Sequence, residues 1–513
     1  MVNISLPATP ADLLASAAKA RSWRAWAPAL VFCLYALAIL LVGARHEAWF
    51  DEAQAWLIAR DATPLEIITR YGRYEGSPPL WHLILWAPAH LGFPYRYLWL
   101  ISGSFGLIGA GLVLFRAPFP FLMRCGIVAG YFFAYQYPIV ARSYALDLAL
   151  FPLLAVLFET RLERPLVYCG VLALLANANA HSCLISGVFG LDYAAAAFRS
   201  GRWKESRILA GAALYGVFAL AAVAMTWPPE DVSFATHDAS PLMALRAAVL
   251  MAEPFVERID VWSQAEPSVV ARLWGAALTT VLLIPSYLLF AQARTRMLFL
   301  GAFAVFFAFT TAKYGQAWHT GILFMVWVFA LWVSWPAAPK LAPRARTALL
   351  ASLCVILGVQ ACYTAAAWSR EVSQVYAPGE DVAKAIADYR KSHPGAHVEG
   401  FGDMTFAVQP WAPGNLFDNF NGGAKMPAFY DWRTSQPFTP LPTLPAWTEA
   451  IGKAKRDVLL LSNFNQITDA ERDRYYALAA KAGFCLRFFD GRMVWKTYDH
   501  DPLGIAMFTR CGA

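Results

Sequence analysis

The sequence predicts a polytopic α-helical membrane protein with a C-terminal α/β domain outside the membrane. Of its 513 residues, 58% are hydrophobic and 15% are charged, whereas soluble domains carry about 25% charged residues. Apolar runs recur along residues 26–368, while residues 369–513 are more polar. The net charge of +7 does not indicate nucleic-acid binding, because the basic residues lie in short loops between apolar runs.

The N-terminal segment, residues 1–25, is predicted to be cytoplasmic. Lys19, Arg21 and Arg24 lead into the first apolar run, and no small-residue cleavage site follows that run. It therefore has the pattern of a retained signal anchor.

Eleven apolar runs are predicted to span the membrane, with loose boundaries because several are short for a hydrocarbon core of about 30 Å. They are residues 26–43, 97–115, 125–141, 145–159, 165–180, 183–198, 208–226, 271–290, 297–312, 318–335 and 347–367. A further run, 79–91, reaches only about 20 Å as a helix. We expect it to form a re-entrant or interfacial half-helix.

The distribution of basic residues favours this count. If 79–91 does not cross, the Arg- and Lys-containing loops all share a side with the basic N-terminus, as expected for cytoplasmic loops. The N-terminus is then cytoplasmic, and the C-terminus and the outer loops 44–96 and 227–269 are periplasmic. This topology suits the inner membrane of a bacterium.

Residues 369–513 are predicted to form the periplasmic α/β domain. The predicted helices are Glu380–Lys391 and Thr468–Lys481, and the predicted strands are His397–Gly402, Asp457–Ser462, Phe484–Phe489 and Met493–Tyr498. The stretch 404–447, rich in Pro, Gly, Asn and aromatic residues, is expected to act as a lid, to bind an acceptor or to pack. Cys485 and Cys511 could pair in an oxidising compartment, and the spacing leaves that open.

Ionisable and polar residues gather at the outer ends of the predicted spans. Such groups are costly to bury unpaired near a bilayer, so they are functional candidates by default. They come from many separated loops yet fall on one side: His46, Asp51, Glu52, Glu75, His82, Arg142, Tyr144, Asp147, His181, Lys313 and His319. This distribution predicts a site at the outer bilayer surface.

Three motifs on this side carry a resemblance to a known family. They are Trp49-Phe50-Asp51-Glu52-Ala53-Gln54-Ala55, Tyr74-Glu75-Gly76-Ser77-Pro78-Pro79-Leu80-Trp81 and Ala141-Arg142-Ser143-Tyr144-Ala145-Leu146. Their order and spacing over roughly 45–320 resemble the GT-C glycosyltransferases. The similarity is to the bacterial branch related to protein O-mannosyltransferases and to the lipid A aminoarabinose transferase. The resemblance implies a GT-C-like bundle of about 11 transmembrane helices.

The resemblance also implies a polyprenyl-phosphate-sugar donor. Asp51 matches the acid that deprotonates or orients the acceptor, or binds a metal in some branches of the family, and Glu75 matches the acid near the donor phosphate and sugar. The aminoarabinose transferase branch follows that second acid with a lysine, whereas this chain has Gly76. Other cations must then hold the phosphate.

Physical chemistry suggests which residues take over the donor phosphate. Arg142 can bind two phosphate oxygens in a fork, and Lys313 and His319 can add charge from another outer loop. The complete phosphate set is Arg142, Lys313, His319 and Tyr144, with Glu52, His82 and His181 as additional candidates. No cofactor is expected, although the Asp51-Glu52 pair could bind Mg²⁺ or Mn²⁺ through oxygen ligands.

Each candidate also has a structural interpretation. Arg142 can snorkel to the headgroups, Lys313 can be an interfacial anchor, and Glu75 can be a charge at a helix start. His82 and His181 can be structural histidines. Asp51 and Glu75 are the predicted catalytic residues.

The predicted function is transfer of a hexose or pentose from a polyprenyl phosphate to an envelope glycan, lipid or protein on the periplasmic side. One alternative is an O-antigen-type polymerase or ligase, which would use Arg246, Arg258 and His237 in loop 227–269. Another is a lipid-linked sugar transporter or flippase, which predicts inverted repeats. The sequence shows no convincing repeat.

Overall fold

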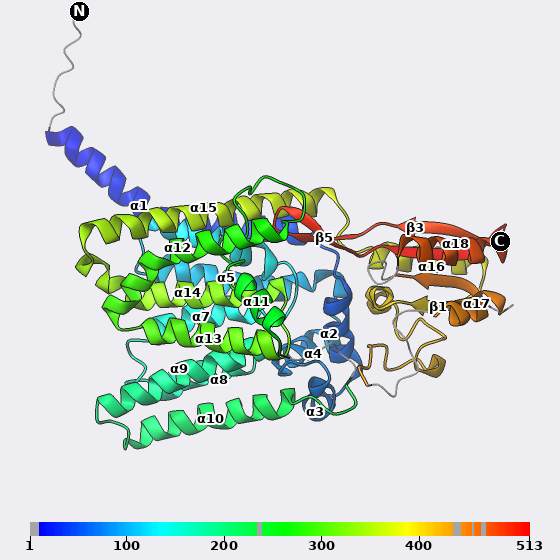
Figure 1. Cartoon of the computed structure of the whole chain (residues 1–513), viewed down its shortest axis with the longest axis horizontal. Helices are drawn as coiled ribbons and strands as arrows, with labels where there is room; N and C mark the ends of the chain where they lie inside the picture. Colours follow the sequence, from blue (N-terminus) through cyan, green and yellow to red (C-terminus); the bar gives the residue numbers. More distant parts are fainter. Residues whose placement is uncertain (1–9, 233–238, 434–442, 454–455, 463–467, 513) are drawn as a thin grey trace, which may run out of the picture.

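The computed structural model describes residues 10–232, 239–433, 443–453, 456–462 and 468–512. A bundle of roughly parallel helices is joined at one end to a small α/β domain (Figure 1). The short helices α2, α3 and α4 lie at that same end of the bundle, beside the α/β domain. We call this end the domain side.

All eleven predicted spans coincide with helical segments. The bundle helices are α1 (Pro10–Gly43), α5 (Trp99–Arg116), α6 (Phe121–Val128), α7 (Ala145–Leu157), α8 (Pro165–Ala176), α9 (Ala180–Arg199), α10 (Ser206–Thr226), α12 (Val269–Ala293), α13 (Arg296–Ala312), α14 (Gly321–Ser334) and α15 (Pro343–Ser373). Among the described residues, six helical stretches are long and apolar enough to cross a membrane. The chain is a multi-pass membrane protein, and the count of eleven spans stays a prediction.

Burial separates the centre of the bundle from its periphery. α7 and α14 are buried along almost their whole length, whereas α10 and α12 expose many apolar side chains. A helix that is apolar all round suits either a protein interior or a lipid boundary. α7 packs against α5, α8 and α14, so it links both halves of the bundle.

The predicted span 125–141 is interrupted. α6 ends at Val128, and Phe132–Gln136 form a π-helical turn. Such wide turns replace regular α-helical hydrogen bonds locally and often occur at functional sites. All five side chains of the turn are buried, and Tyr135 directs its hydroxyl toward the site described below.

Short helices occupy the predicted outer loops. They are α2 (Phe50–Asp61), α3 (Pro64–Thr69), η1 (Tyr71–Arg73), α4 (Leu80–His90), η2 (Tyr95–Tyr97), α11 (Pro241–Leu250) and η4 (Ala317–Thr320). A further short helix, η5 (Trp335–Lys340), lies in a loop predicted to be cytoplasmic. α4 starts directly after Pro78-Pro79 and has 11 residues, too few to span a bilayer unaided. Thr63 and Glu66 cap α3 reciprocally.

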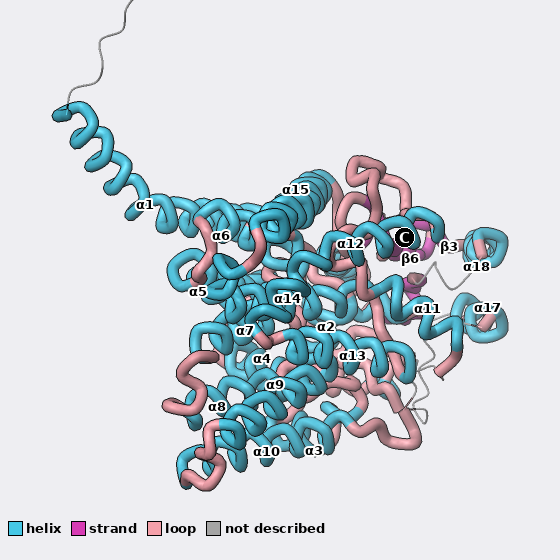
Figure 2. The backbone as a smooth tube through the Cα atoms, turned by 60° about the vertical axis from the view of Figure 1, so that its left-hand side comes forward, coloured by secondary structure: helices cyan, strands magenta, loops and turns pink. Residues whose placement is uncertain are grey.

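The α/β domain is built on a four-stranded sheet of order β1-β2-β6-β3, in which β1 and β2 are parallel and the other pairs antiparallel. Its elements are α16 (Gly379–Ser392), β1 (His397–Phe401), η6 (Asp403–Trp411), η7 (Asn421–Gly423), α17 (Leu444–Gly452), β2 (Arg456–Leu461), α18 (Asp469–Lys481), β3 (Phe484–Phe489), β4 (Arg492–Trp495), β5 (Tyr498–Pro502) and β6 (Ile505–Arg510). Trp447 and Tyr475 pack α17 and α18 against the sheet. Figure 2 places the sheet and these two helices at one side of the bundle.

Most of the predicted elements of this domain are present, with two differences. The predicted strand Met493–Tyr498 is a hairpin of β4 and β5, turning at Lys496 and Thr497. The central strand β6 and helix α17 were not predicted. Cys485 and Cys511 form a disulfide, which joins the start of β3 to the chain just after β6.

The β4–β5 hairpin inserts a buried lysine into the bundle. The Nζ atom of Lys496 is 2.7 Å from Glu257 Oε2 and donates to the Glu253 carbonyl at 2.9 Å. The Tyr498 hydroxyl donates to Glu257 at 3.1 Å. Because the Lys496 side chain is 0% exposed, this ion pair lies inside the junction between the two parts of the protein.

Candidate active site at the domain side of the bundle

Asp51 begins the site at the first turn of α2. Its carboxylate forms an ion pair with the guanidinium of Arg142, and both side chains are 25% exposed. Arg142 lies in the loop before α7, so the contact joins two of the three motifs found in the sequence. Burial raises the pKa of Asp51, and the charge of Arg142 opposes that rise.

Aromatic side chains surround the guanidinium of Arg142. It lies 6.0 Å from the ring centroid of Trp49 and 5.5 Å from that of Tyr144, distances at which a cation is attracted to the ring. The Tyr144 ring in turn contacts His319 edge-on, with centroids 5.5 Å apart. The rings of Trp49 and Tyr144 therefore hold the guanidinium group of Arg142 in place, and this partly exposed group can still bind a ligand.

Glu52, next to Asp51, is completely buried. Its carboxylate accepts hydrogen bonds from the backbone amides of Ala141 at 2.6 Å and Trp49 at 3.2 Å. The bond to Ala141 fixes the start of the Arg142 loop, and the bond to Trp49 closes the N-terminus of α2. Glu52 thus holds together the two segments that carry Asp51 and Arg142.

His46 extends this network to the end of α15. Its Nε2 atom is 3.0 Å from Glu52, its Nδ1 atom is 2.9 Å from Glu371, and Glu371 also accepts from Tyr135 at 2.5 Å. Burial alone lowers the pKa of His46, but the two carboxylates outweigh it and hold the pKa well above its ordinary value. A protonated imidazole donates a hydrogen bond to each of the two carboxylates, and the negative charge that remains is stabilised by the amides of Ala141 and Trp49 and by the Tyr135 hydroxyl.

Glu75, the acid before Pro78-Pro79, lies near the Asp51 pair. It accepts a hydrogen bond from Gln54 Nε2 at 2.9 Å and another from the Trp432 side chain. Burial and the nearby charge of Asp51 raise the pKa of Glu75 to about 7, although these hydrogen bonds and Arg142 oppose the rise. The carboxyl group is therefore partly protonated at neutral pH.

The α/β domain closes over this end of the bundle. Gln54 exchanges two hydrogen bonds with the backbone of Tyr430, at 2.6 and 2.8 Å. Ala428 N donates to Asp61 at 2.7 Å. Within the stretch 404–447, η6 and residues 428–430 thus pack on α2, while residues 434–442 lie outside the described residues.

Asp403 adds a carboxylate from the α/β domain. Burial and the charge of Asp51 together raise its pKa to about 6, although hydrogen bonds from the backbone amides of Met404 and of Asp403 itself oppose the rise. Asp51 is thus close to acids from two other segments, Glu75 and Asp403, and pairs with one guanidinium. Among the described residues, no group of three or more His, Cys, Asp or Glu side chains is placed to hold a metal ion.

Two stacked histidines, His181 and His319, lie next to Tyr144. The rings of His181 and His319 stack with centroids 4.5 Å apart, and His319 Nδ1 accepts from Gln316 N at 2.7 Å. Asp147, which is fully buried in the first turn of α7, accepts hydrogen bonds from Asn179 and Ser182, each at 2.9 Å. Asp147 therefore stabilises the N-terminus of α9.

Not every residue selected from the sequence joins this cluster. Lys313 is exposed at the end of α13, and its side chain has no hydrogen bond or ion pair with a described residue. His82 is buried in α4. Burial and the nearby positive charge of Arg142 lower the pKa of its imidazole. Its role, like that of Lys313, stays a prediction.

Arg246 and Arg258, the described residues of the alternative site in loop 227–269, make separate contacts. Arg258 is buried and donates to the carbonyls of Ser263 and Ala265 in its own loop, the latter at 2.6 Å. Arg246 donates to Gln316 at 3.2 Å. His237 lies outside the described residues.

The site also contains residues that the sequence did not single out. They are Gln54, Tyr135, Glu371, Asp403, Tyr430 and Trp432. Glu371 had a usable signal, since it is an acid at the end of an apolar run. Asp403, Tyr430 and Trp432 come from segments whose approach depends on the docking of the α/β domain, whereas Gln54 lies in α2 and Tyr135 in the π-helical turn.

No family model matches the chain, and no curated protein matches it. Among solved structures, the fold is similar to the crystal structure of ArnT from Cupriavidus metallidurans bound to undecaprenyl phosphate. The TM-score is 0.51 at 12% sequence identity, and the alignment covers 95% of this chain and 99% of that chain.

The fold and the site together define a class: a multi-pass helical membrane protein with an acid–arginine pair beneath a C-terminal α/β domain. Within that class, the architecture is similar to that of ArnT over nearly the whole length of both chains. The expected polytopic helical fold with a C-terminal α/β domain is confirmed. Because 95% of the chain is covered, the similarity also extends into residues 369–513, which the sequence resemblance left out.

Proposed function

We propose that this protein is a membrane glycosyltransferase that moves a sugar from a polyprenyl-phosphate donor to an acceptor of the cell envelope. The observation that carries the proposal is the Asp51–Arg142 pair at one end of an ArnT-like bundle. The proposal includes a bacterial inner-membrane location with the domain side facing the periplasm. The acceptor is a glycan, lipid or protein.

The proposed reaction needs a base and a phosphate clamp. Asp51 accepts the proton of the acceptor hydroxyl as that oxygen attacks the anomeric carbon of the donor sugar. The bond between the anomeric carbon and the phosphate oxygen breaks, and polyprenyl phosphate leaves with the electron pair. Arg142 neutralises the charge that develops on the leaving phosphate.

The ion pair in the structure is the resting arrangement in this proposal. While no phosphate is bound, Arg142 keeps Asp51 ionised and positioned. When the donor arrives, the guanidinium fork turns toward the phosphate oxygens, and Asp51 is released to act as a base. Tyr144 and His319 border the same space, which supports a role in donor binding.

Glu75 serves the donor in its protonated form. A carboxylate beside a phosphate would repel it, whereas a neutral carboxyl group can donate a hydrogen bond. The pKa of about 7 makes that form available at neutral pH. Because Asp51 pairs with Arg142 and Glu52 with two backbone amides and His46, we propose that transfer needs no divalent cation.

The polymerase or ligase alternative is less well supported. Arg258 is committed to carbonyls of its own loop, so it is not free to act on a lipid-linked sugar. We therefore retain the glycosyltransferase that uses Asp51.

Mass analysis of envelope glycans, lipids and proteins from a deletion strain tests the proposal. We expect one sugar to be missing at a defined attachment point, restored by the wild-type gene and not by Asp51→Asn. An unchanged set of envelope sugars would contradict the proposed function.

A further inference from the structure

A cavity separate from the candidate active site lies on the side of α2 that carries Glu52. It has a volume of about 580 Å³ and lies where the end of α1, η2 and the start of α5 meet the α/β domain. Ligand sites typically have volumes of about 300–1,000 Å³ and often lie at such junctions. The cavity is distinct from the Asp51–Arg142 pair, because Asp51 and Arg142 do not line it.

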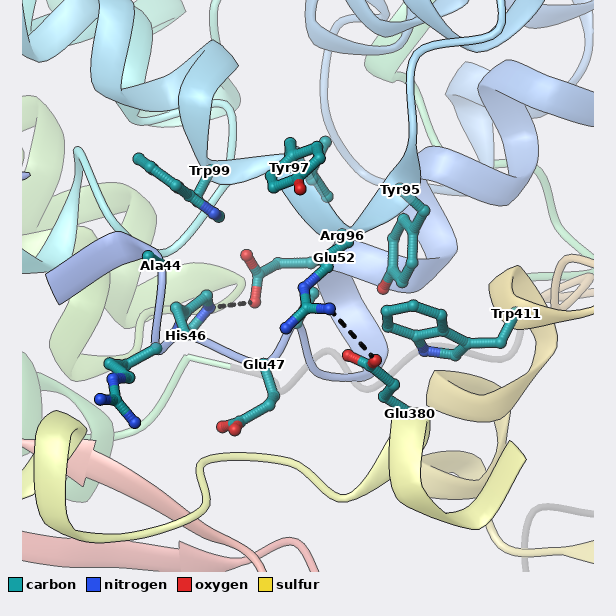
Figure 3. Close-up of a pocket in the computed structure, with 13 residues that line it drawn as sticks. Ala44, His46, Glu47, Glu52, Tyr95, Arg96, Tyr97, Trp99, Glu380 and Trp411 are labelled. Carbon is teal, nitrogen blue, oxygen red and sulfur yellow. Dashed lines mark hydrogen bonds and ion pairs between the residues drawn. The ribbon is translucent and has the colours of Figure 1, made fainter. Parts of the chain in front are cut away.

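Aromatic and charged side chains line opposite sides of this cavity. Figure 3 shows Trp99, Tyr97 and Tyr95 on one side, Glu47 and Glu380 on the other, and Arg96 reaching across. Flat aromatic faces bind the C–H faces of sugar rings, while carboxylates and guanidinium groups hydrogen-bond to hydroxyls. The combination is suited to a ligand that is both apolar on its faces and polar at its edge.

Basic and acidic side chains are equal in number along the cavity lining. Arg96 lies 3.8 Å from Glu380, which also pairs with Lys384 at 2.8 Å, and His46 pairs with Glu52 at 3.0 Å. Arg45 and Glu47 complete the three basic and three acidic residues of the lining. A lining with no excess of either sign does not select a phosphate or an amine, so it favours an uncharged ligand with many hydroxyl groups.

One buried polar atom in the lining lacks a partner. The Tyr95 side chain is only 7% exposed, and its hydroxyl has no hydrogen-bond partner among the described residues. Figure 3 shows this hydroxyl pointing toward the cavity, between Trp411 and Glu52. An unsatisfied buried hydroxyl costs about 1–3 kcal/mol, which a hydroxyl of a bound ligand can recover.

We propose that this cavity binds an uncharged sugar ring of the acceptor. That the sugar belongs to the acceptor rests on the proposed function, whereas the preference for an uncharged sugar rests on the residues of the lining alone. Because Glu52 forms part of the wall and is joined to Asp51 along the chain, a sugar held here would belong to a neighbouring unit of an acceptor that reaches Asp51 with another hydroxyl.

Saturation-transfer NMR tests this proposal with the full-length protein in a detergent without a sugar headgroup. The probes are glucose, galactose, mannose and N-acetylglucosamine, with glycerol phosphate as the anionic comparison. We expect saturation of at least one sugar by the wild-type protein and by Asp51→Asn. The signal should fall at least fivefold in Arg96→Ala and in Tyr97→Ala, both exposed positions that tolerate truncation.

Arg492→Ala is the matched control, because Arg492 is a half-exposed arginine of the α/β domain outside the cavity. It should leave the signal unchanged. Saturation of none of the four sugars, a sugar signal that survives both cavity variants, or binding of glycerol phosphate alone would each overturn the proposal. If sugars bind as expected while no transfer to any acceptor is found, the cavity assignment stands and the proposed function fails.

Discussion

The carboxylate of Glu52 accepts a 2.6 Å hydrogen bond from the backbone amide of Ala141, 89 residues further along the chain. The neighbours of these two residues, Asp51 and Arg142, form the ion pair of the candidate site. One buried acid therefore sets the spacing between the proposed base and the proposed phosphate clamp. Glu52 is a positioning residue, and Asp51 is the proposed catalytic one.

Replacing Glu52 should lower the turnover rate strongly and change the affinity for the donor little. Glu52→Gln keeps the shape but offers a single acceptor oxygen to three donors, so we expect kcat to fall at least tenfold while KM for the donor changes little. Glu52→Ala should also lower the thermal midpoint, because the Ala141 amide and His46 lose their partner. A purely structural role would instead lower the midpoint and leave kcat per folded molecule unchanged.

Arg142 should show a different kinetic pattern. Arg142→Lys keeps the charge but loses the fork, so KM for the donor should rise. Arg142→Ala should lower kcat by about 10²–10³-fold, the range found when one stabilising donor is removed from an active site. Arg124→Ala is the control, since Arg124 hydrogen-bonds to carbonyls near the start of α6. Equal effects of both variants would argue against a phosphate clamp.

Glu75 should give the reaction an alkaline limb. With a pKa of about 7, its carboxyl group is mostly protonated at pH 6 and mostly ionised at pH 8. If the neutral form donates to the phosphate, transfer should fall as pH rises through 7. Glu75→Gln, which is neutral at every pH, should abolish that limb in a pH–rate profile measured between pH 5.5 and 9. An identical alkaline limb in Glu75→Gln would assign it to another group.

Lys496 should matter for stability rather than for chemistry. Lys496→Ala leaves Glu257 buried without its cation, and breaking such a pair typically costs about 3–5 kcal/mol. We expect a clear fall in the thermal midpoint, measured by tryptophan fluorescence. Lys384→Ala removes an exposed lysine of an ion pair and should have little effect. Similar small shifts for both would show that the hairpin does not fasten the domain.

The bundle could be predicted because each of its helices is specified locally. An apolar run of sufficient length forms a helix in a membrane whatever its neighbours are, so all eleven runs are found as helical segments. The break between α6 and the π-helical turn was missed, because residues 125–141 carry no charge and are mostly apolar. The hydropathy of such a run does not reveal a local change in hydrogen bonding.

The site could be predicted only in part, for a physical reason. Asp51, Arg142 and Glu75 stand out because charge is rare at the ends of apolar runs. Asp403, Gln54 and Tyr430 come together only when the α/β domain docks, and such polar residues are common in any soluble domain. The strand β6 was missed for a similar reason, since its pairing with β2 and β3 depends on residues far apart in the sequence.

The central claim is that Asp51 removes the acceptor proton in transfer of a sugar from a polyprenyl phosphate. The most direct test is release of polyprenyl phosphate from a labelled donor by wild-type protein and Asp51→Asn in membranes of the same lipid composition. We expect acceptor-dependent release by the wild type and a loss of about 10²–10⁴-fold in Asp51→Asn, with an unchanged thermal midpoint. Full turnover by Asp51→Asn would contradict the account.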